Sequence, residues 1–219
     1  DRLRSRGLGD VYKRQLQRLA PDSTYKIYCA LFGLEEGTIS PENTSIKWNG
    51  ETYPFAEWNQ DQTLASAMAS SVNWYFQTID KKLEKERITS YLEQINYGNK
   101  RITGDLSSYW MESALKISPV EQVELLIDLY NNNFDFSIEN ITAVKNALCI
   151  SSSDTYALYG KTGTGRVNEK DISGWFIGYV ETTDTTYFFA TNIRANTNAT
   201  GSHAAEITFD IFKNLNIIT

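Results

Sequence analysis

The sequence predicts an α+β fold in which helices flank an antiparallel β-sheet. Helical spacing of apolar residues dominates the first two thirds of the chain, residues rich in Tyr, Phe, Val, Ile and Thr dominate 156–193, and a helical pattern returns over 201–215. Strands that follow one another closely favour antiparallel pairing, and helices gathered before and after them favour segregated layers. A chain of 219 residues is long enough for one domain with its own core.

Residues 1–15 differ from the rest of the chain, because they hold five Arg or Lys residues and show no apolar periodicity. We interpret them as an appended, non-native segment and expect the domain to cover 16–219. The alternative is a native basic arm that contacts an anionic surface.

The first helix is expected from about Ser23 to Glu36. Four apolar residues at helical spacing lie between 27 and 34, a Pro-Asp pair precedes Ser23, and Gly37 follows. Ser23 therefore lies in the first turn. Residues 40–60 are rich in Pro, Asn, Gly and aromatic residues, which predicts an irregular segment.

Further helical patterns cover 62–69, 73–83 and 84–95. Ser118, Pro119 and Glu121 form the sequence pattern of a capping box with a first-turn proline, which predicts a helix to about Asn131. Another helix is expected from Ser137 to about Leu148.

Strands are predicted over 156–162, 172–182 and 186–193, and residues 183–185 can turn the last two into a hairpin. The final helix is expected over 201–215. Because little native-looking chain precedes Ser23, we also expect the sheet to lack N-terminal strands.

Composition excludes several classes of function. The net charge of −6 argues against nucleic-acid binding, and no apolar run of 18 or more residues predicts a membrane span. Cys29 and Cys149 lack the spacing of a metal or redox site, so we expect two buried thiols.

The chain contains one histidine, His203, which leaves too few ligands for a His-rich zinc site, so no metal is expected. We expect His203 to be a surface or capping residue. A serine nucleophile in this chain would therefore need a base other than imidazole, and lysine is the better candidate.

Ser23 and Lys26 lie three residues apart on the first predicted helix, where they share a face. A serine three residues before a lysine is common by chance, and Ser113 and Lys116 form a second such pair. We prefer Ser23, because its helix is apolar, whereas charged and polar residues flank Ser113.

The run Lys161-Thr162-Gly163-Thr164-Gly165 is rarer. It ends a predicted strand and is followed by another, and a strand edge without side chains at the glycines lets a ligand lie alongside it. The alternative is a glycine-rich hairpin turn.

Together, Ser23-x-x-Lys26, Ser71-Val72-Asn73 and Lys161-Thr162-Gly163 resemble the signature of penicillin-recognising serine acyltransferases and β-lactamases. Tyr97-Gly98-Asn99 and Tyr109-Trp110-Met111-Glu112 resemble class D β-lactamases. Within that class, the segment Ser71–Phe76 is most similar to the extracellular sensor domain of Gram-positive β-lactam sensor-transducer receptors. Hydrolytic members usually have valine in place of Asn73.

The resemblance implies roles for these residues. Ser23 is the nucleophile, Lys26 is its base, and Ser71 bridges toward the lactam nitrogen, which is the leaving group. In class D relatives the lysine is carbamylated by CO₂, and Trp110 is expected to donate to that carbamate; no other cofactor is implied. The backbone N–H groups of Ser23 and Thr164 would hold the oxyanion. The residues expected to bind the substrate carboxylate are Lys161, Thr162, Gly163, Thr164 and, as a candidate for an additional family arginine, Arg194.

Asn73 separates two functions. An amide beside Lys26 could bind the amine, favour loss of the carbamate and strand the acyl group, which suits a sensor of β-lactams better than a hydrolase. We therefore favour an extracytoplasmic β-lactam sensor domain, at the outer face of the membrane, whose parent is membrane-anchored. A secreted class D β-lactamase is the alternative, and deacylation speed decides whether the protein is an enzyme. A third interpretation is a carbohydrate- or peptide-binding module that uses the aromatic residues Trp48, Tyr53, Phe55, Trp58, Trp74 and Tyr75.

Overall fold

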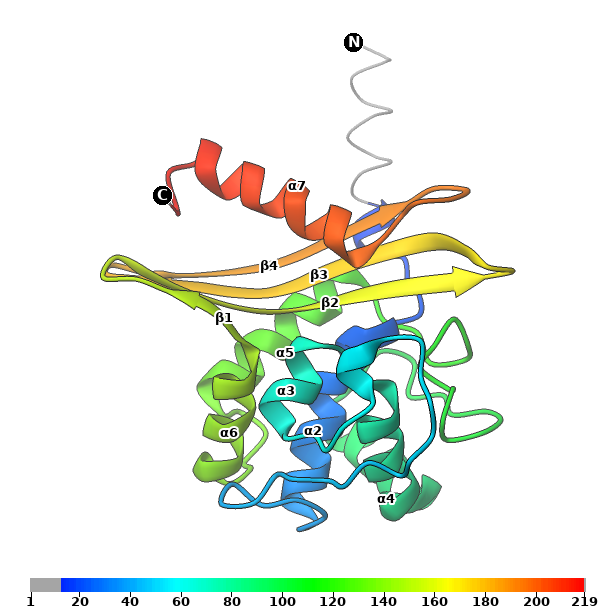
Figure 1. The fold of residues 1–219 in the computed structure, drawn as a ribbon. Helices are drawn as coiled ribbons and strands as arrows, with labels where there is room; N and C mark the ends of the chain where they lie inside the picture. Colours follow the sequence, from blue (N-terminus) through cyan, green and yellow to red (C-terminus); the bar gives the residue numbers. More distant parts are fainter. Residues whose placement is uncertain (1–12, 219) are drawn as a thin grey trace.

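The computed structural model describes residues 13–218, which form one antiparallel sheet with helices on both faces (Figure 1). The helices are η1 (Asp22–Tyr25), α2 (Lys26–Glu35), η2 (Ala56–Trp58), α3 (Leu64–Ala69), α4 (Asn73–Gln94), α5 (Pro119–Asn131), α6 (Ile138–Leu148) and α7 (Gly201–Asn214). The strands are β1 (Cys149–Ser152), β2 (Tyr156–Val167), β3 (Lys170–Thr182) and β4 (Thr186–Arg194). The predicted α+β class is confirmed.

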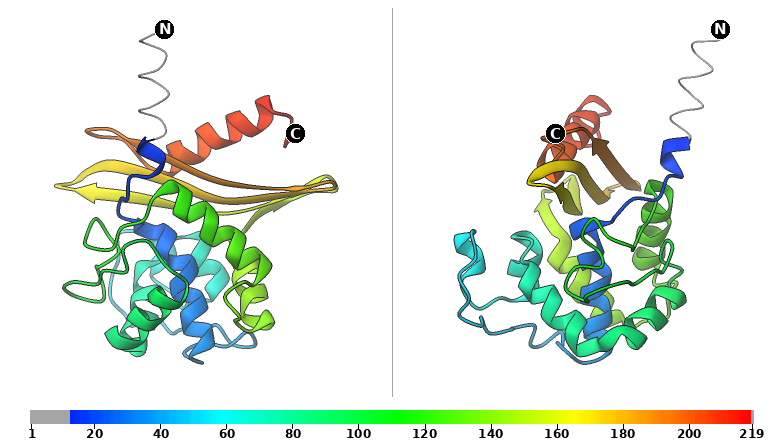
Figure 2. Two further views of the ribbon diagram at one scale, coloured as in Figure 1. Left: turned by 180° about the vertical axis from the view of Figure 1, so that it is seen from behind. Right: turned by 90° about the vertical axis from the view of Figure 1, so that its right-hand side faces the viewer.

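The four strands lie in the order β1-β2-β3-β4, and α7 covers one face of the sheet while α2 to α6 lie on the other side (Figures 1 and 2). After β4 the chain turns back, and its backbone at Thr200 lies close to the backbone of β3 at Gly174. A Cβ atom on Gly174 would lie 2.2 Å from the carbonyl oxygen of Thr200. The glycine therefore lets the start of α7 rest directly on the backbone of β3.

Two sets of apolar side chains hold these layers together. The larger core fills the space around α2 and reaches the sheet at Trp175 and Ile177. On the opposite face, Phe176 packs with Ala204 and Ala205 of α7. Neighbouring residues of β3 point to opposite faces, so this strand contributes to both cores.

The predicted capping box is confirmed. Ser118 Oγ accepts a hydrogen bond from Glu121 N, and the Glu121 carboxylate accepts one from Ser118 N at 2.9 Å. Helix α5 then begins at Pro119 and ends before Asn132, which adopts the left-handed conformation. The helix predicted from Ser137 is confirmed as α6.

Two helix boundaries differ from the sequence prediction. Helix α2 begins at Lys26, because residues 22–25 form a tighter 3₁₀ turn that begins at Asp22, whose φ of 48° is left-handed. The helices predicted over 73–83 and 84–95 form one element, α4, which is broken at Glu84, where φ is 62°. The predicted junction is therefore at the right residue.

The sheet is larger than predicted. Strand β1 was not expected, and β2 continues five residues past Thr162 to Val167, because β3 pairs with it along that whole length. The prediction that Cys149 is buried is wrong: it is exposed at the start of the edge strand β1, whereas Cys29 is buried as expected. The hairpin turn predicted at 183–185 is confirmed by the hydrogen bond from Thr182 N to Thr185 O at 2.9 Å.

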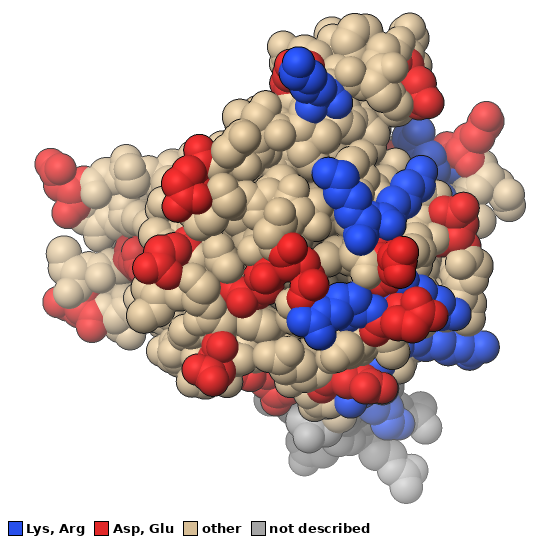
Figure 3. Space-filling model, turned by 90° about the horizontal axis from the view of Figure 1, so that it is seen from below, with Lys and Arg blue, Asp and Glu red and all other residues tan. Residues whose placement is uncertain are grey.

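The surface has mixed charge. Figure 3 shows acidic and basic side chains interspersed on the face seen from below. Within residues 13–218, the structure contains no helix that is long and apolar enough to cross a membrane. Most of the segment that we interpreted as appended, residues 1–12, lies outside the described residues.

The capping box yields a first prediction. Ser118→Ala removes both hydroxyl hydrogen bonds at the start of α5 and should lower the free energy of unfolding by about 1 kcal/mol in a urea titration. Ser137→Ala is the matched control, because the Ser137 hydroxyl makes no capping hydrogen bond to the α6 backbone. A loss at Ser137 equal to the loss at Ser118 would contradict this account.

Candidate active site

Ser23 and Lys26 face each other across the junction of η1 and α2. The Nζ atom of Lys26 lies 3.0 Å from Ser23 Oγ and donates a hydrogen bond to it. The Lys26 side chain is 0% exposed, although it is an ionisable group. The tight turn before α2 places the serine at the helix end, where it is only partly covered.

Three more oxygen atoms surround the same amine. Lys26 Nζ lies 2.7 Å from the carbonyl oxygen of Ser71, 2.9 Å from Ser71 Oγ and 2.6 Å from Asn73 Oδ1. Ser71 adopts a left-handed φ of 52° in the turn between α3 and α4, which aims its carbonyl and hydroxyl groups at the lysine. Every one of these partners is a neutral oxygen.

Burial lowers the pKa of Lys26 well below its usual value, and the nearby charge of Lys161 lowers it further. An ammonium ion loses its hydration when it is buried, and no carboxylate hydrogen-bonds to this one to compensate among residues 13–218. The site therefore favours a neutral amine beside Ser23.

Lys161 lies on β2 and completes the group. Its Nζ donates to Ser71 Oγ at 3.0 Å and to the carbonyl oxygen of Thr162 at 3.1 Å. Ser71 Oγ thus lies between two lysine amines. Burial lowers the pKa of Lys161 to about 7.

The run 161–165 lies inside β2, not at its end as predicted. Strand β1 pairs with β2 only at residues 157–159, so the backbone edge of 161–165 faces the helical half. A Cβ atom on Gly163 would lie 3.2 Å from the Pro21 carbonyl oxygen and 3.3 Å from Ser23 N. A side chain here would be tightly packed, because β2 passes directly over the serine.

Two adjoining cavities open above Ser23. The larger, of about 560 Å³, and the smaller, of about 240 Å³, share Ser23, Phe55, Asn73 and Thr164. Thr162 and Gly163 line only the smaller cavity. Thr164 also holds the start of α7, since its Oγ1 accepts a hydrogen bond from Gly201 N at 2.9 Å.

Trp110 lies beneath this group and is fully buried. Lys26 Nζ lies 5.3 Å from the centre of its ring. The indole Nε1–H has no hydrogen-bond partner within the described part of the chain. A buried donor without a partner is costly, which marks this position as one where an acceptor can be added.

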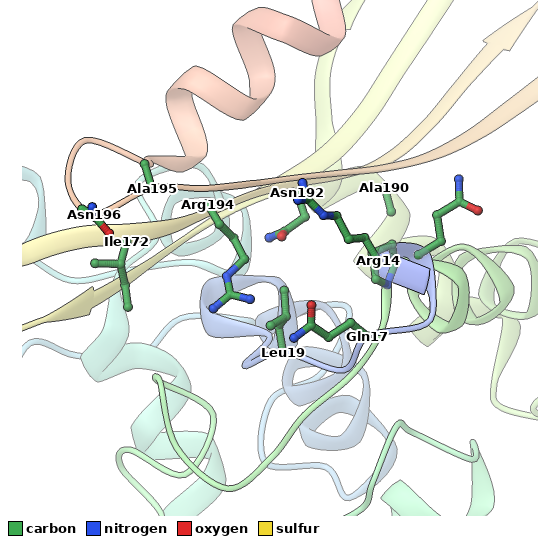
Figure 4. A pocket seen from close by; sticks show the side chains of 11 residues that line it. Arg14, Gln17, Leu19, Ile172, Ala190, Asn192, Arg194, Ala195 and Asn196 are labelled. Carbon is green, nitrogen blue, oxygen red and sulfur yellow. The ribbon is translucent and has the colours of Figure 1, made fainter. Parts of the chain in front are cut away.

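Arg194 is not brought to these cavities. It is paired with Ser173, so β3 separates it from β2, a displacement of about 10 Å at ordinary strand spacing. Figure 4 shows its side chain extending toward Leu19 and Gln17 in a different cavity of about 790 Å³.

The sequence analysis missed other residues at the site. Arg166 lines the larger cavity and forms an ion pair with Asp171 at 2.7 Å. Its position directly after Gly165 is the sequence feature that could have identified it. Asp22 lines the same cavity, and nothing in the local pattern marked it.

The remaining candidates lie elsewhere or divide into separate sets. His203 is exposed at the start of α7, where its backbone N–H donates to the capping Thr200, as expected. Trp74 and Tyr75 are buried, whereas Phe55 is 56% exposed. The aromatic residues therefore do not form one open binding platform. Across residues 13–218, no group of His, Cys, Asp and Glu side chains could hold a metal ion.

Comparison with known proteins gives consistent matches. The family model of the penicillin binding protein transpeptidase domain matches residues 10–214. The methicillin resistance mecR1 protein of Staphylococcus aureus is 46% identical over 202 residues, which cover 92% of this chain and 34% of that protein. The chain thus spans about a third of that relative's length.

The C-terminal domain of the Bacillus licheniformis BlaR penicillin-receptor has the same fold, with a TM-score of 0.90 and 44% identity over 95% of this chain and 84% of that one. The probable beta-lactamase YbxI of Bacillus subtilis is 37% identical over 94% of this chain and 75% of that protein. Identity is therefore higher to the mecR1 protein and to the BlaR penicillin-receptor than to the probable beta-lactamase.

The buried lysine yields a prediction about stability. The pKa of Lys161 is about 7 in the folded protein and 10.5 in its ordinary state, which the unfolded chain approaches. Between these two values the unfolded state binds one proton more than the folded state. Stability should then rise with pH, and the rise should be steeper in the wild type than in Lys161→Met by about 1.4 kcal/mol per unit between about pH 8 and about pH 9.5.

Urea titrations across that range measure the slope. Lys82→Met, at an exposed lysine of α4, is the control and should keep the wild-type slope. Equal slopes for the wild type and Lys161→Met would show that Lys161 is charged in the folded protein.

Proposed function

Because this chain belongs to the penicillin-binding-protein transpeptidase family, we propose that it binds β-lactams covalently through Ser23 and acts as the sensor domain of an antibiotic-resistance signal transducer. The parent protein is then anchored in the cell membrane, with this domain on its outer face. The domain begins at about residue 16, and residues 1–15 are appended.

The chemistry starts with the neutral amine of Lys26. It takes the proton of Ser23 Oγ, 3.0 Å away, as the oxygen attacks the lactam carbonyl carbon. Backbone N–H groups of Ser23 and Thr164 stabilise the negative oxygen. The lactam C–N bond then breaks, and the proton reaches the leaving nitrogen through Ser71 Oγ, which Lys26 and Lys161 both contact.

The ligand carboxylate binds on the β2 side. Lys161, Thr162, Gly163 and Thr164 lie along the strand edge that passes over Ser23, so a bicyclic lactam acylated at Ser23 can place its carboxylate there. Arg194 has no part in this step, since it lines a different cavity.

A carboxyl group on Lys26 fits the residues present. A buried neutral amine reacts with CO₂, and the unpartnered Nε1–H of Trp110 supplies the hydrogen bond that the carboxyl oxygen needs. Such a group would supply a carboxylate at this position that can act as a general base. It is also the observation that favours the second candidate function, a class D β-lactamase, because that base can activate water.

The contact between Asn73 and Lys26 carries our preference for the sensor. Asn73 Oδ1 lies 2.6 Å from Lys26 Nζ and binds the amine itself, which competes with the carboxyl group for the same nitrogen. The amide is held in turn, because its Nδ2 contacts Met111 Sδ at 3.6 Å. Once Ser23 is acylated, the amine stays bound to Asn73, water is not activated, and the acyl group remains.

We predict that a chromogenic cephalosporin labels the wild type with one equivalent that persists for many minutes, measured by intact-protein mass spectrometry. Ser23→Ala should abolish labelling. Ser113→Ala is the matched control, because Ser113 and Lys116 form the other serine-lysine pair but lie in an irregular loop, and it should label fully. Release within seconds would overturn the sensor in favour of the hydrolase.

Asn73→Val should speed release of the acyl group by at least about tenfold, since it removes the acceptor that holds the amine of Lys26. The release rate is measured by following the loss of acyl-protein after excess ligand is removed. Asn214→Val, at an exposed position near the end of α7, should release at the wild-type rate. An unchanged rate in Asn73→Val would mean that another group prevents deacylation.

A further inference from the structure

A second polar layer lies directly beneath Lys26. Helix α2 carries Cys29 one turn after Lys26, and α4 carries Asp80 two turns after Asn73, so the two helices meet again one level deeper in the core. Asp80 Oδ1 accepts hydrogen bonds from Cys29 Sγ at 3.3 Å and from the Tyr25 hydroxyl at 3.2 Å. The proposed acylation of Ser23 uses none of these groups.

The groups that face Asp80 are all neutral at pH 7. They are Tyr25 from η1, Cys29 from α2 and Tyr109 from the loop before α5, and burial raises the pKa of each. Tyr109 joins the layer by donating to the Tyr25 hydroxyl. No cationic side chain pairs with Asp80 within residues 13–218. A carboxylate here is therefore a buried charge without a counter-ion.

Asp80 and Trp110 each keep one group free. Asp80 Oδ2 and Trp110 Nε1 are both buried and both lack a hydrogen-bond partner among the described residues. The pKa of Asp80 is raised to about 7. Burial is the cause of this rise, and the nearby Cys29, Tyr25 and Trp110 groups partly oppose it. The indole is thus close enough to favour the charged carboxylate, although no well-formed hydrogen bond joins the two.

The indole N–H has two possible acceptors. One is Asp80 Oδ2, and the other is a carboxyl group on Lys26, whose Nζ lies 5.3 Å from the Trp110 ring centre. Two carboxylates in one buried cluster repel each other, so only one of them can be ionised without a large cost.

We propose that Asp80 is a positioning residue that takes up one proton when Lys26 is carboxylated, which keeps the charge of the buried cluster constant. This inference rests on the part of the proposed function in which Lys26 can carry a carboxyl group before Ser23 is acylated. The Lys26 nitrogen forms a bond to the carbon of CO₂, one C=O electron pair moves to oxygen to give the carboxylate, and the amine loses a proton. Asp80 gains a proton in the same equilibrium, and the Trp110 N–H, which has no hydrogen-bond partner among the described residues, donates to the new carboxylate.

Carboxylation should therefore depend less on pH in the wild type than in Asp80→Asn. With asparagine at this position, the proton that Asp80 would take goes to solvent. Above about pH 7, where Asp80 is ionised while Lys26 is free, the ratio of carboxylated to free Lys26 should then gain an additional factor of about ten for each unit rise in pH, relative to the wild type. The difference between the two proteins does not depend on whether free Lys26 is neutral or protonated. Any proton that Lys26 itself loses on carboxylation is lost in both proteins.

The ratio is measured by NMR with ¹³C-labelled CO₂ at a fixed concentration of dissolved CO₂, from about pH 6.5 to about pH 8.5, around the pH at which a carboxyl of raised pKa titrates. Asp210→Asn, at an exposed acid on α7, is the matched control and should keep the wild-type slope. Equal slopes in the wild type and Asp80→Asn overturn the proposal, as does a wild type that shows no carboxyl signal on Lys26.

A second measurement needs only the wild type, in case Asp80→Asn fails to fold. Infrared difference spectra with and without CO₂ should show a new C=O stretch of a protonated carboxylic acid, and the absence of that band overturns the proposal. Acylation is measured by mass in the same samples. Loss of acylation counts against the proposed function, whereas equal slopes with normal acylation count against the role of Asp80 alone.

Discussion

The complete burial of Lys26 is the constraint on which the site depends. An ammonium ion in this position would lose its hydration and gain only neutral oxygen partners, at a cost of several kcal/mol. The protein meets that constraint by favouring the neutral amine, which is the form that can take a proton from Ser23. The same burial makes the amine reactive toward CO₂ and strengthens its hydrogen bond to Asn73, because solvent does not reach the amine. In the function proposed above, activation of the serine and persistence of the acyl group thus have one physical origin.

Three segments far apart in the sequence meet at this amine. The 3₁₀ turn at 22–25 presents Ser23, the left-handed Ser71 aims two oxygens inward, and β2 carries Lys161 across the top. Each contact requires close approach of backbone. Gly163 allows β2 to pass over Ser23, and Gly174 allows α7 to rest on β3 and hold Thr164. The layers of the fold therefore fix the distances within the site, and the polar layer at Asp80 extends the same arrangement one turn deeper.

Much of this arrangement could be predicted from the sequence, because local patterns encode it. The capping residues at Ser118 located a helix, apolar spacing located α2, and rare runs of residues identified the segments that meet. The misses have long-range causes. Arg194 depends on strand register, which places β3 between it and the cavity. Strand β1 is only four residues long, which is too short for a clear strand pattern. Cys149 is exposed because β1 lies at the edge of the sheet, and the local sequence does not show which strand is the edge. Asp80 resembles an ordinary polar residue on a helix, and only the packing of α2 against α4 shows that it is buried.

The protonation state of Lys26 decides whether this amine can activate Ser23. In protein labelled with ¹³C at the lysine ε-carbon and kept free of CO₂, a pH titration by NMR follows the charge of each amine, and the signal lost in Lys26→Arg assigns the residue. We expect the pKa of Lys26 to lie well below its usual value of 10.5, so that the amine is largely uncharged at the pH where Ser23 is acylated. A Lys26 signal that titrates near 10.5 would contradict it, because a permanently charged lysine could neither accept the serine proton nor react with CO₂.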